Sequence, residues 1–354
     1  DLYVDGSKLT DRDCGGEVLN AEGCYAIPGL TDIHFHGAVG HDFSDGDADG
    51  LAAIAEYELS RGVTQICPAG MTLLPEDLEK MCAVAAEHRK AEKPGASLCG
   101  IHLEGPFLSM AKKGAQNGDW IQRPDVALLR RLEEVSGGLV KLVSIAPEVE
   151  GAMDFIREVS GEVRISIAHT TADYDTAMAA FAAGASHVTH LFNAMPAFAH
   201  RAPGVVGAAF DTPDCRVELI CDGIHIHPSV VRSVFKLFGA DRVVLVSDTM
   251  RAAGMADGDY SLGGQPVIKK GKYATLADGT LAGSVTDLMD CMRTAVSFGI
   301  PLADAVRAAA VNPARAIGIY SRCGSLECGK WANVVLLNKD LSIRNVIFKG
   351  EVIA

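Results

Sequence analysis

The sequence predicts an α/β protein: a (β/α)8 TIM barrel with a small β-sandwich domain built from both termini. Three observations lead to this fold class. Apolar segments with strand character recur between residues 28 and 246, and most are followed by a helical pattern. Such alternation is typical of right-handed βαβ units and a parallel sheet, and eight units form a barrel. Both ends of the chain instead show short strands and turns. We therefore expect a barrel over residues 28–320 and a small domain over residues 1–27 and 321–354.

The elements follow one another in a regular order. The first strand follows the Pro28-Gly29 turn, and seven others come after it. A Gly-rich stretch at 254–283 predicts a β-hairpin insertion, before two helices and a return to short strands. The predicted barrel strands cover residues 31–37, 63–67, 97–103, 141–145, 163–168, 186–191, 216–221 and 242–246. The predicted helices cover residues 75–90, 153–159, 174–183, 229–238, 285–298 and 302–310, and the C-terminal strands cover residues 333–337 and 345–348.

Composition narrows the class of protein. The 354 residues are 48% hydrophobic, which is enough for a substantial core. The formal charge of −13 argues against nucleic acid or an anionic membrane as a partner, and an anionic substrate would need locally placed cations. The ten cysteines lack the spacing of a disulfide framework, which indicates reduced thiols in a cytoplasmic protein. No apolar run reaches the length of a membrane span.

Two histidines occupy the first predicted strand. His34 and His36 alternate with Ile33 and Phe35, and residues two apart in a strand point to the same face. Imidazole is the commonest protein ligand for a metal. An isolated pair of this kind is more often a pair of hydrogen-bonded core histidines, so the other strands decide between the two interpretations.

Histidines and carboxylates recur at the ends of the other predicted strands. Active sites of barrels lie at the C-terminal ends of the strands, and one polar residue there would be unremarkable. Here such residues end or follow most of the strands: Glu104 the third, His169 the fifth, His190 the sixth, His225 the seventh and Asp248 the eighth. This set suits a divalent metal such as zinc or iron(II).

These motifs resemble those of the amidohydrolase superfamily, and within it the family of N-acetylglucosamine-6-phosphate deacetylases. The resemblance runs from about residue 15 to the end. The specific strings are H-L-E-G-P from His102, H-L-F-N-A-M from His190, and D-G-I-H from Asp222. The H-x-H pair, the final Asp248 and the C-terminal N-P-A-R-A-I-G string from Asn312 are common to the superfamily.

The resemblance implies a metal-dependent hydrolysis of a linear amide. Glu104, His169 and His190 would hold one metal, zinc or iron(II). His34 and His36 would be available to a second, with Glu104 bridging and Asp248 close by, so the chain would bind one or two ions. The superfamily's bridging lysine has no counterpart at the end of the fourth strand, where Ala146-Pro147 stands. Asp248 would move a proton from water to the leaving amine.

The resemblance also implies how a phosphorylated amino sugar would be bound. Gln116 stands where some members have histidine, and it can donate a hydrogen bond but carry no charge. Arg201 would reach the neighbouring subunit's site in a homodimer. The implied substrate contacts are Ala115, Gln116, Asn193, Ala194, Arg201, His225, Leu281, Ala282 and Gly283.

Other interpretations remain open at this point. His102 shares a face with Glu104, but packing and hydrogen bonding are favoured over ligation. His187 lies three residues before His190, on the opposite face, which favours the core or the surface. For function, the alternatives are another amidohydrolase, such as a cyclic-amide hydrolase or a deaminase, and a metal-free barrel that acts as a scaffold.

Overall fold

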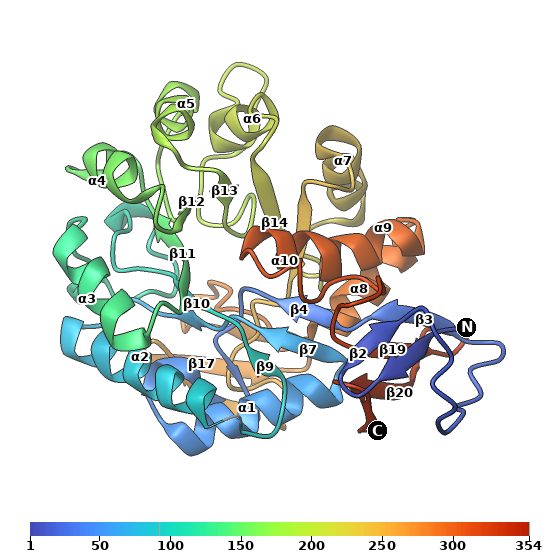
Figure 1. The fold of residues 1–354 in the computed structure, drawn as a ribbon. Coiled ribbons are helices and arrows are strands. Elements are labelled where there is room, and N and C mark those ends of the chain that lie inside the picture. The colour runs from blue at the N-terminus through green and yellow to red at the C-terminus, as the bar shows by residue number, and fades with distance from the viewer. Residues whose placement is uncertain (92, 354) are drawn as a thin grey trace.

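A barrel of parallel strands forms the centre of the computed structural model, which describes residues 1–91 and 93–353 (Figure 1). Seven strands pair in the order β15-β14-β13-β12-β11-β10-β8, and three more in the order β4-β7-β9. The strands are β4 (Leu30–Asp32), β7 (Val63–Ile66), β8 (Ala69–Gly70), β9 (Ser97–Leu98), β10 (Ile101–Leu103), β11 (Val140–Ile145), β12 (Arg164–Ile167), β13 (His187–Val188), β14 (Arg216–Ile220) and β15 (Val243–Val246).

Backbone hydrogen bonds join these strands into one barrel. β7 lies within the second predicted strand, and β8 extends it beyond the predicted end at residue 67. β9 and β10 are pieces of the third predicted strand. Cys67 N donates to Asp32 O at 2.8 Å, so pairing continues across the first interruption. The seam between the first and eighth strands is joined by Asp248 N to His34 O at 2.9 Å and by His36 N to Thr249 O at 2.7 Å. The predicted fold class is confirmed.

Helices cover the outside of the barrel (Figure 1). They form where an apolar face can pack on the strands and where a side chain caps the first turn. In α3, for example, Asp125 accepts from Leu128 N, and Leu128, Leu129 and Leu132 are buried. The helices are α1 (Ala48–Ser60), α2 (Pro75–Lys90), α3 (Val126–Ser136), α4 (Ala152–Val159), α5 (Tyr174–Ala183), α6 (Gly204–Phe210), α7 (Pro228–Phe238) and α8 (Leu288–Ser297).

One end of the barrel is closed by a helical stretch. It comprises α9 (Leu302–Val306), a π-helical turn (Arg307–Val311) and α10 (Asn312–Ala316). Asn312 Nδ2 donates to Val243 O, where β15 begins, at 2.7 Å. Arg164 Nε, where β12 begins, donates to Ala316 O at 2.6 Å. The stretch therefore covers the N-terminal ends of the strands.

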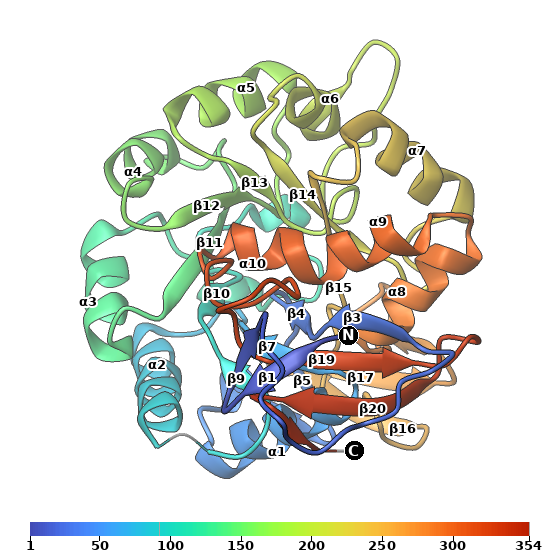
Figure 2. The same cartoon turned by 45° about the vertical axis from the view of Figure 1, so that its right-hand side comes forward.

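The two termini build one small β domain beside the barrel, as predicted (Figure 2). Its antiparallel sheet has the order β21-β20-β19-β3, comprising β3 (Tyr25–Pro28), β19 (Val334–Leu337), β20 (Ile343–Phe348) and β21 (Glu351–Val352). The hairpin of β1 (Tyr3–Asp5) and β2 (Lys8–Thr10) packs on it through Leu9, which clusters with Ala332, Val334 and Leu336. The domain boundaries, with the barrel over residues 28–320 and the small domain over the two terminal segments, stay a proposal. Residue 354 of the second segment lies outside the described part.

Shorter elements complete the chain. The predicted hairpin insertion is a three-stranded antiparallel sheet of β16 (Gly258–Leu262), β17 (Gln265–Lys270) and β18 (Tyr273–Thr275). β5 (Gly37–Ala38) pairs with β6 (His41–Asp42), and 3-10 turns cover Phe43–Asp45, Met110–Lys112 and Gly118–Trp120. All ten cysteines are free. Within the described residues, no helix has the length and apolar character needed to cross a membrane.

Candidate active site

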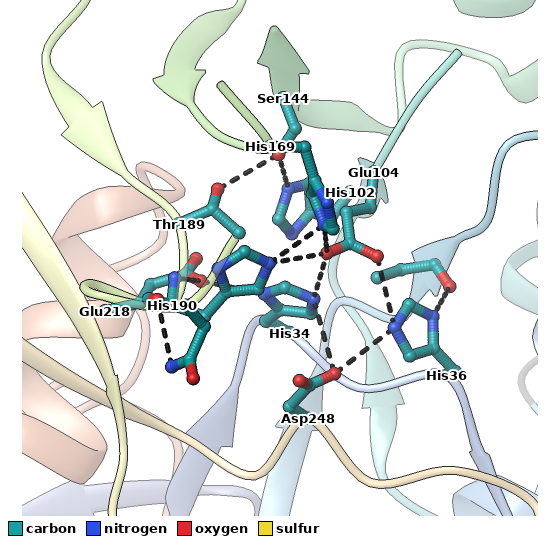
Figure 3. Close-up of polar contacts among 12 residues, drawn as sticks. His34, His36, His102, Glu104, Ser144, His169, Thr189, His190, Glu218 and Asp248 are labelled. Atoms are coloured by element: carbon teal, nitrogen blue, oxygen red, sulfur yellow. Dashed lines mark hydrogen bonds and ion pairs between the residues drawn. The ribbon is translucent and has the colours of Figure 1, made fainter. Parts of the chain in front are cut away.

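One carboxylate lies at the centre of the C-terminal end of the barrel. Glu104 follows β10 directly, and four imidazoles surround it (Figure 3). Its Oε1 lies 3.0 Å from His190 Nε2, 3.1 Å from His169 Nε2 and 3.4 Å from His34 Nε2. Its Oε2 lies 3.3 Å from His36 Nε2. The structure thus brings together five residues that the sequence placed on four different strands.

Asp248 joins this group from the eighth strand. Its Oδ1 lies 3.3 Å from His36 Nε2 and 3.7 Å from His34 Nε2. The two histidines stand just beyond the paired part of the first strand, because β4 ends at Asp32. The expectation that both belong to the strand is wrong in this detail, but both rings still face Glu104.

The backbone is bent sharply where three of these side chains leave their strands. His169, His190 and Asp248 have φ values of 43°, 30° and 49°, in the left-handed region that non-glycine residues rarely adopt. Such strain persists only where surrounding contacts impose it, and it gathers at functional sites. Here Ser109 N donates to His169 O at 3.0 Å, and His190 N donates to a Glu218 carboxylate oxygen at 3.1 Å.

The outer ring nitrogens of three histidines are held by the protein. His34 Nδ1 donates to Glu218 Oε2 at 2.8 Å, His36 Nδ1 to Ala69 O at 3.0 Å and His169 Nδ1 to Lys112 O at 2.8 Å. An imidazole with one nitrogen fixed in this way presents the lone pair of the other, as metal-binding histidines do. Accordingly, the buried His34 Nε2 has no hydrogen-bond partner among the described residues.

Burial and mutual charge set the protonation of the cluster. Burial by itself raises the pKa of Glu104, but the imidazoles, His34 first, bring it well below its usual value. Burial likewise raises the pKa of Asp248, and the hydrogen bond with His36 outweighs it and lowers the pKa. The pKa of His36 is lowered by burial but raised to about 10 by Asp248 and Glu104. Both carboxylates are therefore anions, and the histidines gather around them.

The donor set fits a divalent metal. Three groups of buried side chains place their ligand atoms within 4.8 Å of one another, and two of them share Glu104: His34, His36 and Glu104, and Glu104, His169 and His190. The third comprises His34, His102 and Glu218. Carboxylate oxygen and imidazole nitrogen together suit zinc and iron(II). Because two of the groups share Glu104, the arrangement has the donors for two neighbouring ions.

Comparison with known proteins identifies the family. A model of the amidohydrolase family matches residues 25–353. This chain belongs to the amidohydrolase family.

Curated and solved relatives of this amidohydrolase match it over most of their length. The N-acetylglucosamine-6-phosphate deacetylase of Bacillus subtilis is 38% identical, covering 92% of this chain and 84% of that protein. The N-acetylgalactosamine-6-phosphate deacetylase of Escherichia coli O157:H7 is 35% identical, covering 97% and 89%. A mutant N-acetyl-D-glucosamine-6-phosphate deacetylase from Mycobacterium smegmatis, solved in complex with N-acetyl-D-glucosamine-6-phosphate, has a TM-score of 0.92 at 34% identity, covering 99% and 93%.

A cavity of about 360 Å³ opens beside Glu104 in this amidohydrolase. Seven of the nine predicted substrate contacts line it: Ala115, Gln116, Asn193, Ala194, His225, Leu281 and Gly283. Ala282 is not among the lining residues and is fully buried beside them. Arg201 is exposed and lies outside the cavity of its own chain, at a turn closed by the Ala199–Ala202 bridge.

Gln116 has a role that its sequence position did not indicate. Its Nε2 donates to Glu104 Oε2 at 2.7 Å, and its Oε1 accepts from Thr72 N at 2.7 Å. The side chain is buried, with 1% exposed. An amide has two N–H donors, so one stays available to a substrate while the other holds Glu104. Gln116 therefore connects the wall of the cavity to the central carboxylate.

A second charged pair faces the same cavity. His225 Nδ1 donates to Asp222 Oδ2 at 2.8 Å, and Asp222 Oδ1 accepts from the backbone N–H groups of Ile224 and His225. Burial lowers the pKa of His225, but Asp222 outweighs burial and raises it. Asp222 therefore favours the charged form of His225 at the cavity wall.

Sequence reasoning missed Lys112 and Glu218. Lys112 lines the cavity, and its Nζ lies 3.5 Å from Met195 O. In the sequence, the only sign of this position was that Lys112 directly precedes Lys113 and a Gly-Ala-Gln string. Glu218 was hidden inside an apolar strand. His187 lies in the core, one of the two places expected for it, and bonds Ser166 Oγ at 3.1 Å. His102 is buried and bonds Ser144 Oγ at 2.8 Å, and the preference for hydrogen bonding over ligation there stays a prediction.

Proposed function

We propose that this amidohydrolase hydrolyses the acetamide of N-acetylglucosamine 6-phosphate to glucosamine 6-phosphate and acetate. The observation that carries the proposal is Glu104, shared by His34, His36, His169 and His190 beside Asp248. The Bacillus subtilis relative, which matches 92% of this chain, is a deacetylase of this sugar phosphate. Neither a cyclic-amide hydrolase nor a deaminase is named among the relatives described above. A metal-free scaffold would gain nothing from strained backbone at three strand ends.

Glu104, His169 and His190 would hold one ion, and His34 and His36 would hold a second with Glu104 between them. A bound divalent metal lowers the pKa of water and polarises an amide carbonyl. In this division of roles, Asp248 accepts the proton of the attacking water and delivers it to the leaving nitrogen. The new bond joins the water oxygen to the acetyl carbon, and the carbon–nitrogen bond breaks. The amine leaves with the shuttled proton, and the acetic acid formed releases its carboxyl proton to become acetate.

The cations at the cavity would meet the phosphate. His225, charged through Asp222, and Lys112 both line the cavity. Asn193, Ala194, Ala115 and the 281–283 segment would contact the sugar and the acetyl group. These cations supply the local positive charge that a chain of net charge −13 needs in order to bind an anion.

The N-acetylgalactosamine-6-phosphate deacetylase among the relatives makes this 4-epimer a second candidate substrate. The test is release of free amine from N-acetylglucosamine 6-phosphate, N-acetylgalactosamine 6-phosphate and unphosphorylated N-acetylglucosamine, using zinc-loaded and iron-loaded protein. We expect the glucosamine phosphate to have the highest kcat/KM. A higher value for the galactosamine phosphate would favour the second candidate, and no amine from either phosphate would reject both.

We also propose a homodimer in which Arg201 completes the neighbouring site. Arg201 is exposed beside Phe198, which is 51% exposed, so this turn can contact a second copy. Arginine binds a phosphate with two parallel hydrogen bonds. The ten free cysteines support a cytoplasmic location, which we propose as well.

The dimer has a direct test. Arg201→Ala should raise KM for the phosphorylated sugar and change little for N-acetylglucosamine, whereas Arg157→Ala, at another exposed arginine, should change neither. Mixing Arg201→Ala chains with Asp248→Asn chains should restore one intact site per heterodimer. Equal loss on both sugars, or no recovery in chains that exchange, would contradict the role.

A further inference from the structure

Glu218 is a fully buried carboxylate in the interior of the barrel. It lies on β14, and its side chain is 0% exposed. Burying a carboxylate is costly unless hydrogen bonds or charges compensate. No lysine or arginine forms an ion pair with Glu218 among the described residues; its close partners are histidines and a backbone N–H. The buried Glu218 carboxylate lies next to the candidate metal site, which suggests that it serves that site.

One oxygen of Glu218 contacts both halves of that site (Figure 3). Oε2 accepts from His34 Nδ1 at 2.8 Å and from the backbone N–H of His190 at 3.1 Å. His34 belongs to the donor group with His36, and His190 belongs to the donor group with His169. Glu218 Oε1 is left 3.7 Å from His187 Nδ1, without a hydrogen bond in the described structure.

The contact with His34 decides which ring nitrogen carries hydrogen. A carboxylate accepts hydrogen bonds only, so Nδ1 must be the protonated nitrogen. In the neutral ring, which is the form that binds a metal, the lone pair of Nε2 then faces Glu104 Oε1 at 3.4 Å and Asp248 Oδ1 at 3.7 Å. Two acceptor atoms opposite a lone pair repel it, and a cation between them would remove that repulsion.

The contact with His190 restrains the backbone. His190 has a φ of 30°, outside the conformations that a histidine favours. The bond from its N–H to Glu218 is one of the contacts that impose this conformation, and the bent backbone directs the ring to Glu104 at 3.0 Å.

We propose that Glu218 is a positioning residue for both ions: it fixes the tautomer of His34 for one and the backbone of His190 for the other. This inference rests on the proposed metal-dependent function and adds to it a residue that touches neither substrate nor metal. Groups that orient metal-binding histidines typically change metal affinity by about 10–100-fold. When the Glu218 carboxylate is removed, affinity for the ion held by His34 should fall more than affinity for the other ion. The reason is that His34 Nδ1 loses its charged hydrogen-bond acceptor.

The experiment compares zinc binding by parent, Glu218→Gln and Ser166→Ala, with zinc as the only probe. Zinc is titrated against a chelator, and bound ions per chain are counted by elemental analysis. Ser166 belongs to the same buried polar network, bonding His187 and Thr189, but it contacts none of the candidate ligands. Ser166→Ala should lower the unfolding temperature and leave zinc affinity unchanged. Glu218→Gln should weaken the more loosely held zinc by about 10–100-fold.

A second measurement needs no variant. Proton NMR of zinc-loaded parent labelled with ¹⁵N-histidine should show a downfield N–H on Nδ1 of His34. Unchanged zinc affinity in Glu218→Gln, or a His34 ring without a proton on Nδ1, would overturn the inference. A parent that binds zinc but releases no amine would reject the proposed function alone, whereas a parent that binds no zinc would reject both.

Discussion

Replacing Gln116 by leucine should weaken both the fold and metal binding. The bond from Gln116 Nε2 to Glu104 Oε2 is 2.7 Å long, and both side chains are nearly inaccessible, at 1% and 3% exposed. Hydrogen bonds to charged groups contribute about 1.5–3 kcal/mol, and the Thr72 N–H left without its acceptor costs about 1–3 kcal/mol. Leucine keeps the apolar volume, so we expect the lower half of the summed range, about 2.5–4 kcal/mol.

Thermal unfolding and elemental analysis measure the two effects. For a chain of 354 residues, a loss of that size should lower Tm by roughly 3–5 °C. Glu104 without its amide partner is less firmly oriented towards His36, so retained metal should fall as well. Gln122→Leu is the matched control, because Gln122 Nε2 bonds only backbone carbonyls, Leu73 O at 3.3 Å and Trp120 O at 3.5 Å. Equal Tm losses in the two variants, with full metal in both, would refute the reasoning.

Three further predictions concern residues around the same cavity. Glu104→Gln should remove the tighter ion while His34→Ala removes at most the second, as counted by elemental analysis; full metal in Glu104→Gln would contradict the shared role of this carboxylate. Asp248→Asn should lower kcat by about 10²–10⁴-fold with near-normal substrate binding, and a kcat within a few-fold of the parent would exclude Asp248 from proton transfer. The raised pKa of His225 keeps its ring charged to higher pH, so KM for the phosphorylated sugar should rise as pH increases through that pKa. Asp222→Asn should move this rise to lower pH, and an unchanged KM–pH profile would remove His225 from phosphate binding.

Much of the barrel could be predicted because its signals are local. α2 matches the predicted residues 75–90, where Pro75 occupies the first turn with Glu76 and Asp77, and basic residues occupy the last turn. The candidate ligands were found because parallel strands bring their C-terminal ends to one edge. β13 was predicted over six residues but pairs only at His187–Val188. The left-handed backbone at His190, imposed by contacts far along the chain, accounts for the difference.

The residues that sequence reasoning missed act through distant partners. Glu218 lies 184 residues from His34 in the chain, and nothing in the segment 216–220 indicates that contact. Gln116 was interpreted as a substrate contact, but its bonds join Thr72 and Glu104, which are 44 and 12 residues away. Such positions carry no motif of their own. Their roles depend on the closure of the barrel, which turns side chains from several strands towards one another.

The acidic composition and the anionic substrate are reconciled at Asp222. A carboxylate near a phosphate site would by itself repel the ligand. Here Asp222 instead accepts hydrogen bonds from His225 Nδ1 and from two backbone N–H groups at 2.9 Å. All three donors lie within its own turn. The imidazole of His225 lines the cavity, whereas the carboxylate of Asp222 is buried and is not among the lining residues. Since electrostatic attraction falls steeply with distance and screening, the nearest group outweighs the net charge of −13 spread over the whole surface. In the proposed binding mode, attraction of the anion is therefore a property of this turn and of Lys112 rather than of the protein as a whole, and salt should weaken it less than it weakens exposed ion pairs.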